Sequence, residues 1–353
     1  MLGKTNVPQL GIAIESENPV YGKTSNPWDT TRSSGGSSGG ESALIAAGGS
    51  PLGLGSDGGG SIRVPSHFAG LCGLKPTTGR LTMNGHWQFP AFPSGWSVPG
   101  PLARSVDDLE LAMRCLVATN GEPSDPSIAP GSIGPSNEVD IAKLRIGFYD
   151  SDDFCVPSPV IRRACRDAVK QLEVAGADIV EFTPAQAMDV WELQLAQFYA
   201  DGGRWMRKYL GKSPVDARIK KTLLNASLPT ALRRALPAIF DSMGQKSMAS
   251  VIRRSRNHHL SAFGFQEALV KQQAFRANFL NRLNESQIDL LICPPFATAA
   301  MKHLSVDIVL GIAYTMVFNL LGMPAGVVPF TTCLLYTSPS PRDLSTSRMP
   351  SSA

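Results

Sequence analysis

The sequence predicts an α/β fold in which a central mixed β-sheet is flanked by α-helices on both sides. A strand-like apolar run at Leu144–Tyr149 is followed by an amphipathic helix and by a second strand-like run at Ala177–Phe182. This β-α-β order implies two parallel strands joined by a right-handed crossover. The 353 residues are 43% hydrophobic and 18% charged, so the chain can bury a large core.

Start and stop signals delimit two of the predicted helices. Ser158-Pro159 supplies an N-cap and a proline at the first helical position, and Gly176 ends the helix that joins the two strands. Another helix begins at Ser105, where Asp108 stands at the position that completes a capping box. Both helices carry apolar residues at helical spacing, so each is expected to bury one face.

Further helices and strands are expected in the second half of the chain. Residues 183–260 are predicted to be mainly helical, and a long helix around 265–283 leads to a short strand at 288–293. The uncharged segment 308–330 is long enough to suggest a membrane span, but Gly322-Met323-Pro324 would break a helix in mid-bilayer. We therefore interpret this segment as a buried helix, a turn and a buried strand.

Charge and cysteine content restrict the classes of function. The net charge of +4 comes from 33 Lys and Arg against 29 Asp and Glu, so no nucleic-acid-binding surface is predicted. The six cysteines have no Cys-x-x-Cys spacing and form no cluster with histidine, so neither a metal site nor a redox motif is predicted. We expect a reduced, cytoplasmic protein.

We expect one domain over residues 1–332 and a Ser/Pro-rich tail over residues 333–353. The last seventeen residues, 337–353, hold six Ser and three Pro with almost no apolar residue, so they cannot offset the entropy of ordering. We interpret the tail as disordered or foreign sequence. The Gly-, Pro- and Ser-rich run 121–137 is expected to be an exposed loop.

Glycine and serine are concentrated in residues 35–60, which hold eleven of the 33 glycines. Two blocks, GGSSGGE at 35–41 and SDGGGSIR at 56–63, flank apolar segments, which a flexible linker would not contain. A phosphate-binding loop needs a lysine after the glycines, and a dinucleotide site needs an acidic residue in a β-α-β unit. Glycines before a serine instead let backbone N–H groups converge on one point, as the oxyanion hole of an acyl-transfer enzyme requires.

A serine nucleophile needs a neighbouring base. Five histidines occur, at His67, His86, His258, His259 and His303, and none stands in an obvious Ser-His-Asp pattern. A lysine that acts through a second serine is the alternative, because Ser-Lys variants of the triad exist. Burial can lower the pKa of a lysine enough for it to accept a proton.

Residues 35–80 closely resemble the defining segment of the amidase signature family. GKTNVP at 3–8 and NPWD at 26–29 are similar to the family as well, especially to its fatty-acid-amide-hydrolase-like members. So are PGPLARSVDDLELAM at 99–113 and LLGMPAGVVPF at 320–330. The resemblance covers roughly residues 1–330 and implies the amidase signature fold, truncated at both ends.

The resemblance implies a Ser–cis-Ser–Lys triad that hydrolyses a carboxamide to a carboxylic acid and ammonia or an amine, without a cofactor. Ser61 matches the nucleophile, and Ser37 matches the bridging serine that follows a cis peptide bond. The backbone and substrate-binding positions implied for the oxyanion hole and its surroundings are Gly58, Gly59, Gly60, Ser61, Ser37 and Gly11. Ser38, Asp57 and Arg63 match the supporting polar residues.

The lysine that the resemblance implies precedes the bridging serine by many tens of residues, whereas Lys4 and Lys23 match other positions. We therefore expect a fragment that lacks the base, turns over no amide and is not readily labelled by fluorophosphonates. Two alternatives stay open: the A-type subunit of a glutamine-dependent tRNA amidotransferase, and an inactive remnant that acts as a binding module. The expected partner is a small amide and not a nucleic acid, and the sequence leaves both a homodimer and membrane association open.

Overall fold

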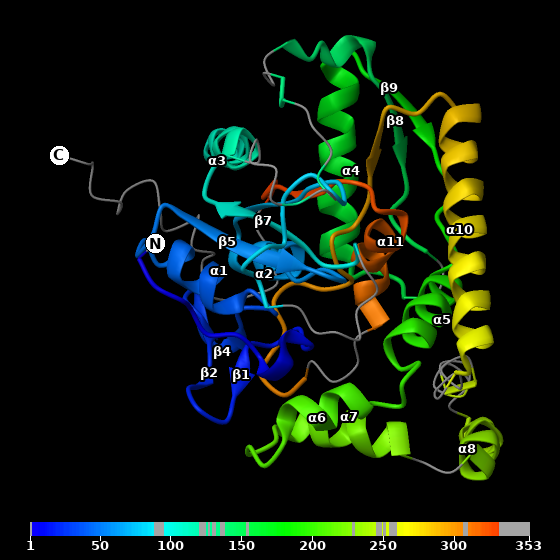
Figure 1. The fold of residues 1–353 in the computed structure, drawn as a ribbon. Helices are drawn as coiled ribbons and strands as arrows, with labels where there is room; N and C mark the ends of the chain where they lie inside the picture. Colours follow the sequence, from blue (N-terminus) through cyan, green and yellow to red (C-terminus); the bar gives the residue numbers. More distant parts are fainter. Residues whose placement is uncertain are drawn as a thin grey trace.

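Two β-sheets surrounded by helices form the framework of the molecule (Figure 1). The computed structural model describes residues 2–87, 95–119, 138–152, 155–227, 230–244, 260–305 and 310–331, with positions 125, 128, 132–134, 249 and 252–253. The antiparallel sheet has the order β11-β6-β7-β5 and comprises Leu52–Asp57 (β5), Cys72–Lys75 (β6), Val98–Ala103 (β7) and Ala325–Val327 (β11). The parallel sheet has the order β10-β8-β9 and comprises Arg145–Phe148 (β8), Asp178–Glu181 (β9) and Leu290–Ile292 (β10).

The predicted α/β fold, with helices around the sheets, is confirmed. Seven of the described strands lie in these two sheets, one antiparallel and one parallel, and four form two-stranded pairs, whereas a single mixed sheet was expected. In the parallel sheet, Ile146 of β8 pairs with Ile179 of β9 on one side and with Leu290 of β10 on the other. Because parallel partners occupy both edges of β8, this strand cannot also pair with a strand of the antiparallel sheet.

Ten helices are described along the chain, and local sequence signals account for several of their ends. Their bounds are Gly39–Ala46 (α1), Arg63–Ala69 (α2), Val106–Thr119 (α3), Pro159–Val174 (α4), Ala187–Phe198 (α5), Arg204–Leu210 (α6), Ala217–Ser227 (α7), Thr230–Ser242 (α8), Ala262–Glu285 (α10) and Ala313–Leu321 (α11). The Asp108 N–H donates to Ser105 Oγ at 3.1 Å, as the capping box predicts. Ser158 is the N-cap of α4 and Pro159 its first residue.

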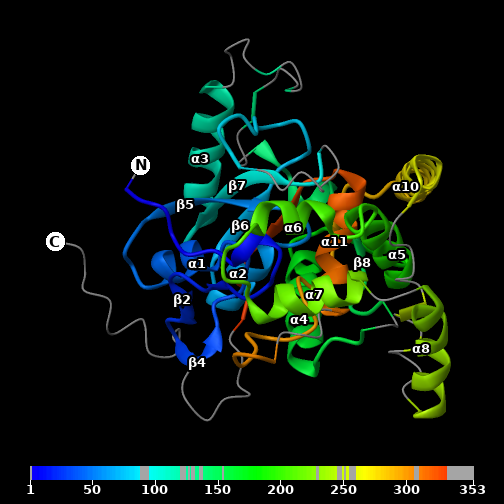
Figure 2. The same cartoon turned by 60° about the horizontal axis from the view of Figure 1, so that its bottom comes forward.

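Shorter elements complete the N-terminal part of the fold. They are a 3₁₀ turn at Gln9–Gly11 and the strand pairs Glu17–Asn18 (β1) with Gly22–Lys23 (β2) and Ser25–Asn26 (β3) with Asp29–Ser33 (β4). Two further 3₁₀ turns lie at Ile141–Lys143 and Leu310–Ile312. Helices α6 and α7 lie at the bottom of Figure 1 and come forward in Figure 2, where they lie in front of the rest of the molecule.

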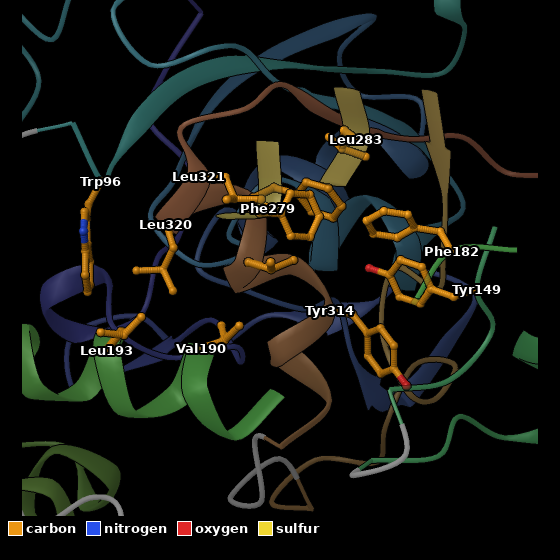
Figure 3. Close-up of a cluster of buried hydrophobic side chains, with 12 residues drawn as sticks. Trp96, Tyr149, Phe182, Val190, Leu193, Phe279, Leu283, Tyr314, Leu320 and Leu321 are labelled. Carbon is orange, nitrogen blue, oxygen red and sulfur yellow. The ribbon is translucent and has the colours of Figure 1, made fainter. Parts of the chain in front are cut away.

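The largest buried cluster joins α5, α10 and α11 (Figure 3). Its members are Trp96, Tyr149, Phe182, Val190, Leu193, Phe279, Leu283, Tyr314, Val317, Phe318, Leu320 and Leu321. In Figure 3, Val190 and Leu193 point from α5 toward the leucines at the end of α11. This packing fixes α5 against α11, and both helices also contact the glycine-rich loop described below.

The uncharged C-terminal segment folds as a buried helix, a turn and a strand, as predicted. Gly322 ends α11 in the left-handed conformation with φ of 69°, and β11 then pairs antiparallel with β6. Among the described residues, no helix has both the length and the apolar character needed to cross a bilayer. The predicted tail 333–353 lies outside the described residues, as does most of the predicted loop 121–137.

Candidate active site

The two glycine- and serine-rich blocks of the sequence lie against each other. The first follows β4 and begins α1, and the second joins β5 to α2. The Ser38 N–H donates to the Ser61 carbonyl oxygen at 3.1 Å, so the loops that carry Ser37 and Ser61 touch. The peptide bond between Gly36 and Ser37 is cis, in agreement with the implied family motif.

Close backbone packing explains why glycine stands at two positions of these loops. A Cβ atom on Gly36 would lie 2.6 Å from the Ala13 carbonyl oxygen. Gly60 has φ of 138°, and a Cβ atom there would lie 2.5 Å from Thr315 Oγ1. Any larger residue would therefore push the loop away from its neighbours, and at Gly60 it would also strain the backbone.

A buried ion pair supports the loop before Ser61. Asp57 and Arg63 are 0% and 1% exposed, and Arg63 Nη2 lies 2.8 Å from Asp57 Oδ1. Asp57 also accepts the Gly60 N–H at 2.7 Å and the Ile62 N–H at 3.1 Å. Burial alone would raise the pKa of Asp57, but the charge and hydrogen bonds of Arg63 outweigh burial and hold this pKa well below its usual range. Asp57 is therefore a charged anchor for the loop.

The peptide groups of this loop divide into anchored carbonyls and unengaged N–H groups. Gln194 Nε2 donates to the Gly58 carbonyl at 3.0 Å, and Thr315 Oγ1 donates to the Gly59 carbonyl at 2.7 Å. Within the described part of the chain, the N–H groups of Gly58, Gly59 and Ser61 make no hydrogen bond. These three donors are therefore available to a ligand.

The Gly60 N–H has a hydrogen-bond partner within the loop, unlike those of its neighbours. This N–H was predicted to be an oxyanion donor, but it already donates to the Asp57 carboxylate. The positive φ of Gly60 also turns the chain immediately before Ser61.

Lys75, at the end of β6, carries a buried amine near the Asp57–Arg63 pair. The side chain is 0% exposed, and Nζ donates to the Pro76 carbonyl at 2.9 Å. Burial and the neighbouring Arg63 charge lower the pKa of Lys75 to about 7, although Asp57 acts in the opposite direction. The only sequence signal for this residue is a lysine that ends an otherwise apolar strand.

The remaining predicted residues surround this centre. Ser38 is buried against Gly55, and Gly11 ends the first 3₁₀ turn with φ of 69° and with open space where a Cβ atom would lie. The hydroxyls of Ser37 and Ser61 make no hydrogen bond to any other described residue. The structure thus brings the two serine loops and the Asp57–Arg63 pair together, while no hydrogen bond within the described ranges joins Gly11 to them.

Three of the five histidines, His67, His86 and His303, lie among the described residues, whereas His258 and His259 lie outside them. The imidazoles of His67 and His303 have partners outside the serine loops. His67 Nε2 lies 2.9 Å from the Thr298 carbonyl, and burial lowers the pKa of this imidazole. His303 contacts the buried Glu15 carboxylate through Nδ1 and lies 3.3 Å from Ser25 Oγ through Nε2. Neither of these two imidazoles contacts the hydroxyl of Ser61.

Comparison with known proteins identifies the family of this chain. The sequence matches the family described as Amidase over residues 1–350. The chain belongs to the amidase family. It is 34% identical over 331 residues to Fatty-acid amide hydrolase 1 of Sus scrofa, covering 93% of this chain and 56% of that protein. It is 31% identical over 345 residues to Acetamidase of Aspergillus oryzae, covering 94% of this chain and 57% of that protein.

Other members of the amidase family are similar as well. A Glutamyl-tRNA(Gln) amidotransferase subunit of Legionella pneumophila is 29% identical over 347 residues, covering 93% of this chain and 67% of that protein. A solved structure of Fatty acid amide hydrolase superposes with a TM-score of 0.75 and 29% identity, covering 92% of this chain and 52% of that chain. The chain thus spans little more than half the length of the first curated relatives that it matches.

Proposed function

We propose that the protein hydrolyses a carboxamide to a carboxylic acid and ammonia or an amine, with Ser61 as nucleophile and Ser37 as proton relay. The observation that carries this proposal is the 3.1 Å hydrogen bond from Ser38 N–H to the Ser61 carbonyl, which holds the two serine loops together. The family membership and the similarity to Fatty-acid amide hydrolase 1 and Acetamidase support the same reaction.

The proposed reaction has two halves. Ser61 Oγ attacks the amide carbon, and the unengaged N–H groups of Gly58, Gly59 and Ser61 stabilise the oxyanion that forms. The Ser61 proton passes through the Ser37 hydroxyl to the leaving nitrogen, the C–N bond breaks, and an acyl-enzyme is left. Water then attacks the acyl carbon, the ester bond breaks, and Ser61 regains its proton.

The relay needs a base, and the resemblance implies a lysine. Lys75 is a poor candidate for this role because Nζ is directed to the Pro76 carbonyl and the amine is grouped with Asp57 and Arg63. We therefore assign the base to a lysine matching the family position and give Ser38, Asp57 and Arg63 the role of holding the loops. Residues 1–332 are proposed to form part of an amidase domain, with Gly11 near the acyl group.

The expected setting is a cytoplasmic enzyme that acts on a small amide. The sequence leaves homodimer formation and membrane association open, and neither is needed for the chemistry. The substrate is the one partner that the site itself requires, because the loops present hydrogen-bond donors that no described residue uses.

The test compares two alanine variants in a protein that carries the implied lysine. Ser61→Ala should lower the turnover of amides by roughly 10³-fold or more, because the nucleophile is lost. Ser37→Ala should lower kcat roughly 10²- to 10⁴-fold with the fold intact, because the proton path is cut. Ser50→Ala is the matched control, since Ser50 is a buried serine outside both loops whose Oγ bonds to the Leu52 carbonyl.

Near-normal turnover by Ser37→Ala would show that another group moves the proton. The similarity to a Glutamyl-tRNA(Gln) amidotransferase component favours one second function, the release of ammonia from glutamine for a charged tRNA. Glutamine hydrolysis that occurs only when partner chains are added would favour that function over independent amide hydrolysis. A correctly folded lysine-bearing protein with no activity in either assay would favour the binding-module alternative.

A further inference from the structure

Gln194 is a buried polar residue of α5 that lies against the glycine loop before Ser61. The side chain is 4% exposed, and Nε2 donates to the Gly58 carbonyl at 3.0 Å. Because a carbonyl oxygen can only accept, this contact decides which amide atom of Gln194 is the nitrogen. A Cβ atom on Gly59 would lie 3.4 Å from the same nitrogen. Gln194 therefore contacts the residues whose N–H groups form the proposed oxyanion hole.

The other amide atom of Gln194 has no partner. Oε1 is buried and accepts no hydrogen bond from any described residue. Buried polar side-chain atoms in proteins are nearly always hydrogen-bonded, since an unpaired buried acceptor costs free energy. An unpaired acceptor beside unengaged backbone donors indicates that a ligand supplies the missing donor.

A second buried polar atom lies on the same face of α5. Trp191 is one turn before Gln194, and its Nε1 is buried without a partner among the described residues. Trp191 packs against the cluster of Ile14, Val64, Phe68, Phe296 and Ile312, and Met316 packs against the same cluster. Met316 Cγ also lies 3.5 Å from the Cβ position of Gly59, which places Trp191, Gln194 and the loop around one region.

We propose that Gln194 is a substrate-binding residue whose Oε1 accepts a hydrogen bond from the N–H of a carboxamide substrate. The inference rests on the proposed function. A carboxamide whose oxygen binds the N–H groups of Gly58 and Gly59 presents its own N–H from the same planar group, and that N–H needs an acceptor beside the loop. Gln194 Oε1 is such an acceptor, so the site selects primary and secondary amides over tertiary amides and esters.

The packing of α5 makes this acceptor rigid. Val190 and Leu193 are buried against α11 (Figure 3), and Thr315 of α11 holds the next carbonyl of the loop, that of Gly59. The glutamine and the loop are thus positioned by the same pair of helices. A side chain held in this way loses little freedom when it binds a ligand.

Gln197 offers a matched control on the same helix. It is also a glutamine, is 2% exposed and has a buried Oε1 that accepts no hydrogen bond from any described residue. Its Nε2, however, donates to Gln272 Oε1 of α10 at 3.1 Å and not to the glycine loop. Replacing Gln197 by methionine therefore reproduces the loss of a buried amide on α5 without touching the loop.

The test measures ligand binding in the 353-residue chain with Ser61→Ala, so that no turnover occurs. The probes are hexanamide, N,N-dimethylhexanamide and methyl hexanoate, which share an acyl group but differ in whether they carry an N–H. Dissociation constants are measured by calorimetry or by ligand-detected NMR, with Gln194 intact, with Gln194→Met and with Gln197→Met.

We expect hexanamide to bind better than the other two probes. The ratio of their dissociation constants to that of hexanamide should fall about fivefold in Gln194→Met, which corresponds to the loss of one net hydrogen bond. Gln197→Met should keep the preference. Equal weakening of all three probes in Gln194→Met would overturn the proposal, because Gln194 would then only support the loop. Failure of all three probes to bind the protein with Gln194 intact would also overturn it.

A separate assay keeps this result distinct from the proposed function. Ammonia release from hexanamide is measured in the lysine-bearing protein with Ser61 intact. If hexanamide is hydrolysed but Gln194→Met keeps the binding preference, the proposed role of Gln194 is refuted and the proposed reaction stands. A preference lost in Gln194→Met without any hydrolysis would refute the proposed reaction and retain the binding site.

Discussion

Lys75 should make the stability of the protein depend on pH in a direction unusual for a lysine. Burial of its amine and the nearby charge of Arg63 lower the pKa of Lys75 from 10.5 to about 7 in the folded protein. The unfolded chain returns the amine to water and to its ordinary pKa. Between pH 7 and 10.5 the unfolded state therefore binds more protons, so the free energy of unfolding rises with pH.

The magnitude follows from the two pKa values. Each pH unit between them changes the free energy of unfolding by up to about 1.4 kcal/mol. With a folded pKa of about 7, Lys75 should contribute about 2 kcal/mol of added stability between pH 7 and pH 9. Lys75→Met keeps the volume of the side chain and removes the titrating amine, so this contribution should disappear.

Urea unfolding followed by circular dichroism at pH 7, 8 and 9 measures the effect. Comparison of the two proteins at each pH cancels the titration of groups that they share. We expect the wild-type free energy of unfolding to gain about 2 kcal/mol relative to Lys75→Met across this range. Parallel pH profiles would refute the reasoning, because they would show that Lys75 has the same pKa in the folded and unfolded chains.

Two further substitutions test the support of the glycine loop. Asp57→Asn should lower the free energy of unfolding by about 3–5 kcal/mol in urea titrations, because Arg63 stays buried without its counter-charge. A loss below about 1 kcal/mol would contradict the role of Asp57 as a charged anchor of the loop. Gly60→Ala should lower the melting temperature by circular dichroism far more than Gly48→Ala. Both glycines have positive φ, but a Cβ atom meets Thr315 at 2.5 Å in the first case and nothing within 4 Å in the second. Equal shifts would refute the contact argument.

The sequence was sufficient for those parts of the fold that local chemistry determines. Ser158-Pro159 and Gly176 delimit α4, and its neighbours β8 and β9 pair in parallel as the β-α-β pattern predicts. The two glycine- and serine-rich blocks also indicated where the candidate site lies, because each block is a continuous stretch of sequence that can be recognised without the fold. The arrangement of strands into two sheets was not predicted, since β8 and β10 are far apart along the chain and their pairing leaves no local signal.

Contacts between distant residues also explain what was missed in the candidate site. Gln194 lies 136 residues after Gly58, and its helix has the pattern of an ordinary half-buried helix. The Gly60 N–H could not be assigned to Asp57 from spacing alone, because that bond depends on how the loop turns. The low pKa of Lys75 similarly depends on Arg63, which only the folded chain brings near.

The identity of the nucleophile is the central claim, and labelling tests it most directly. A protein that carries the implied lysine is treated with a fluorophosphonate, and the modified peptide is identified by mass spectrometry, with Ser61→Ala as the control. We expect one adduct, on Ser61, that is absent from Ser61→Ala, with Ser37 unmodified. An adduct on another residue while Ser61 stays unmodified would contradict the account.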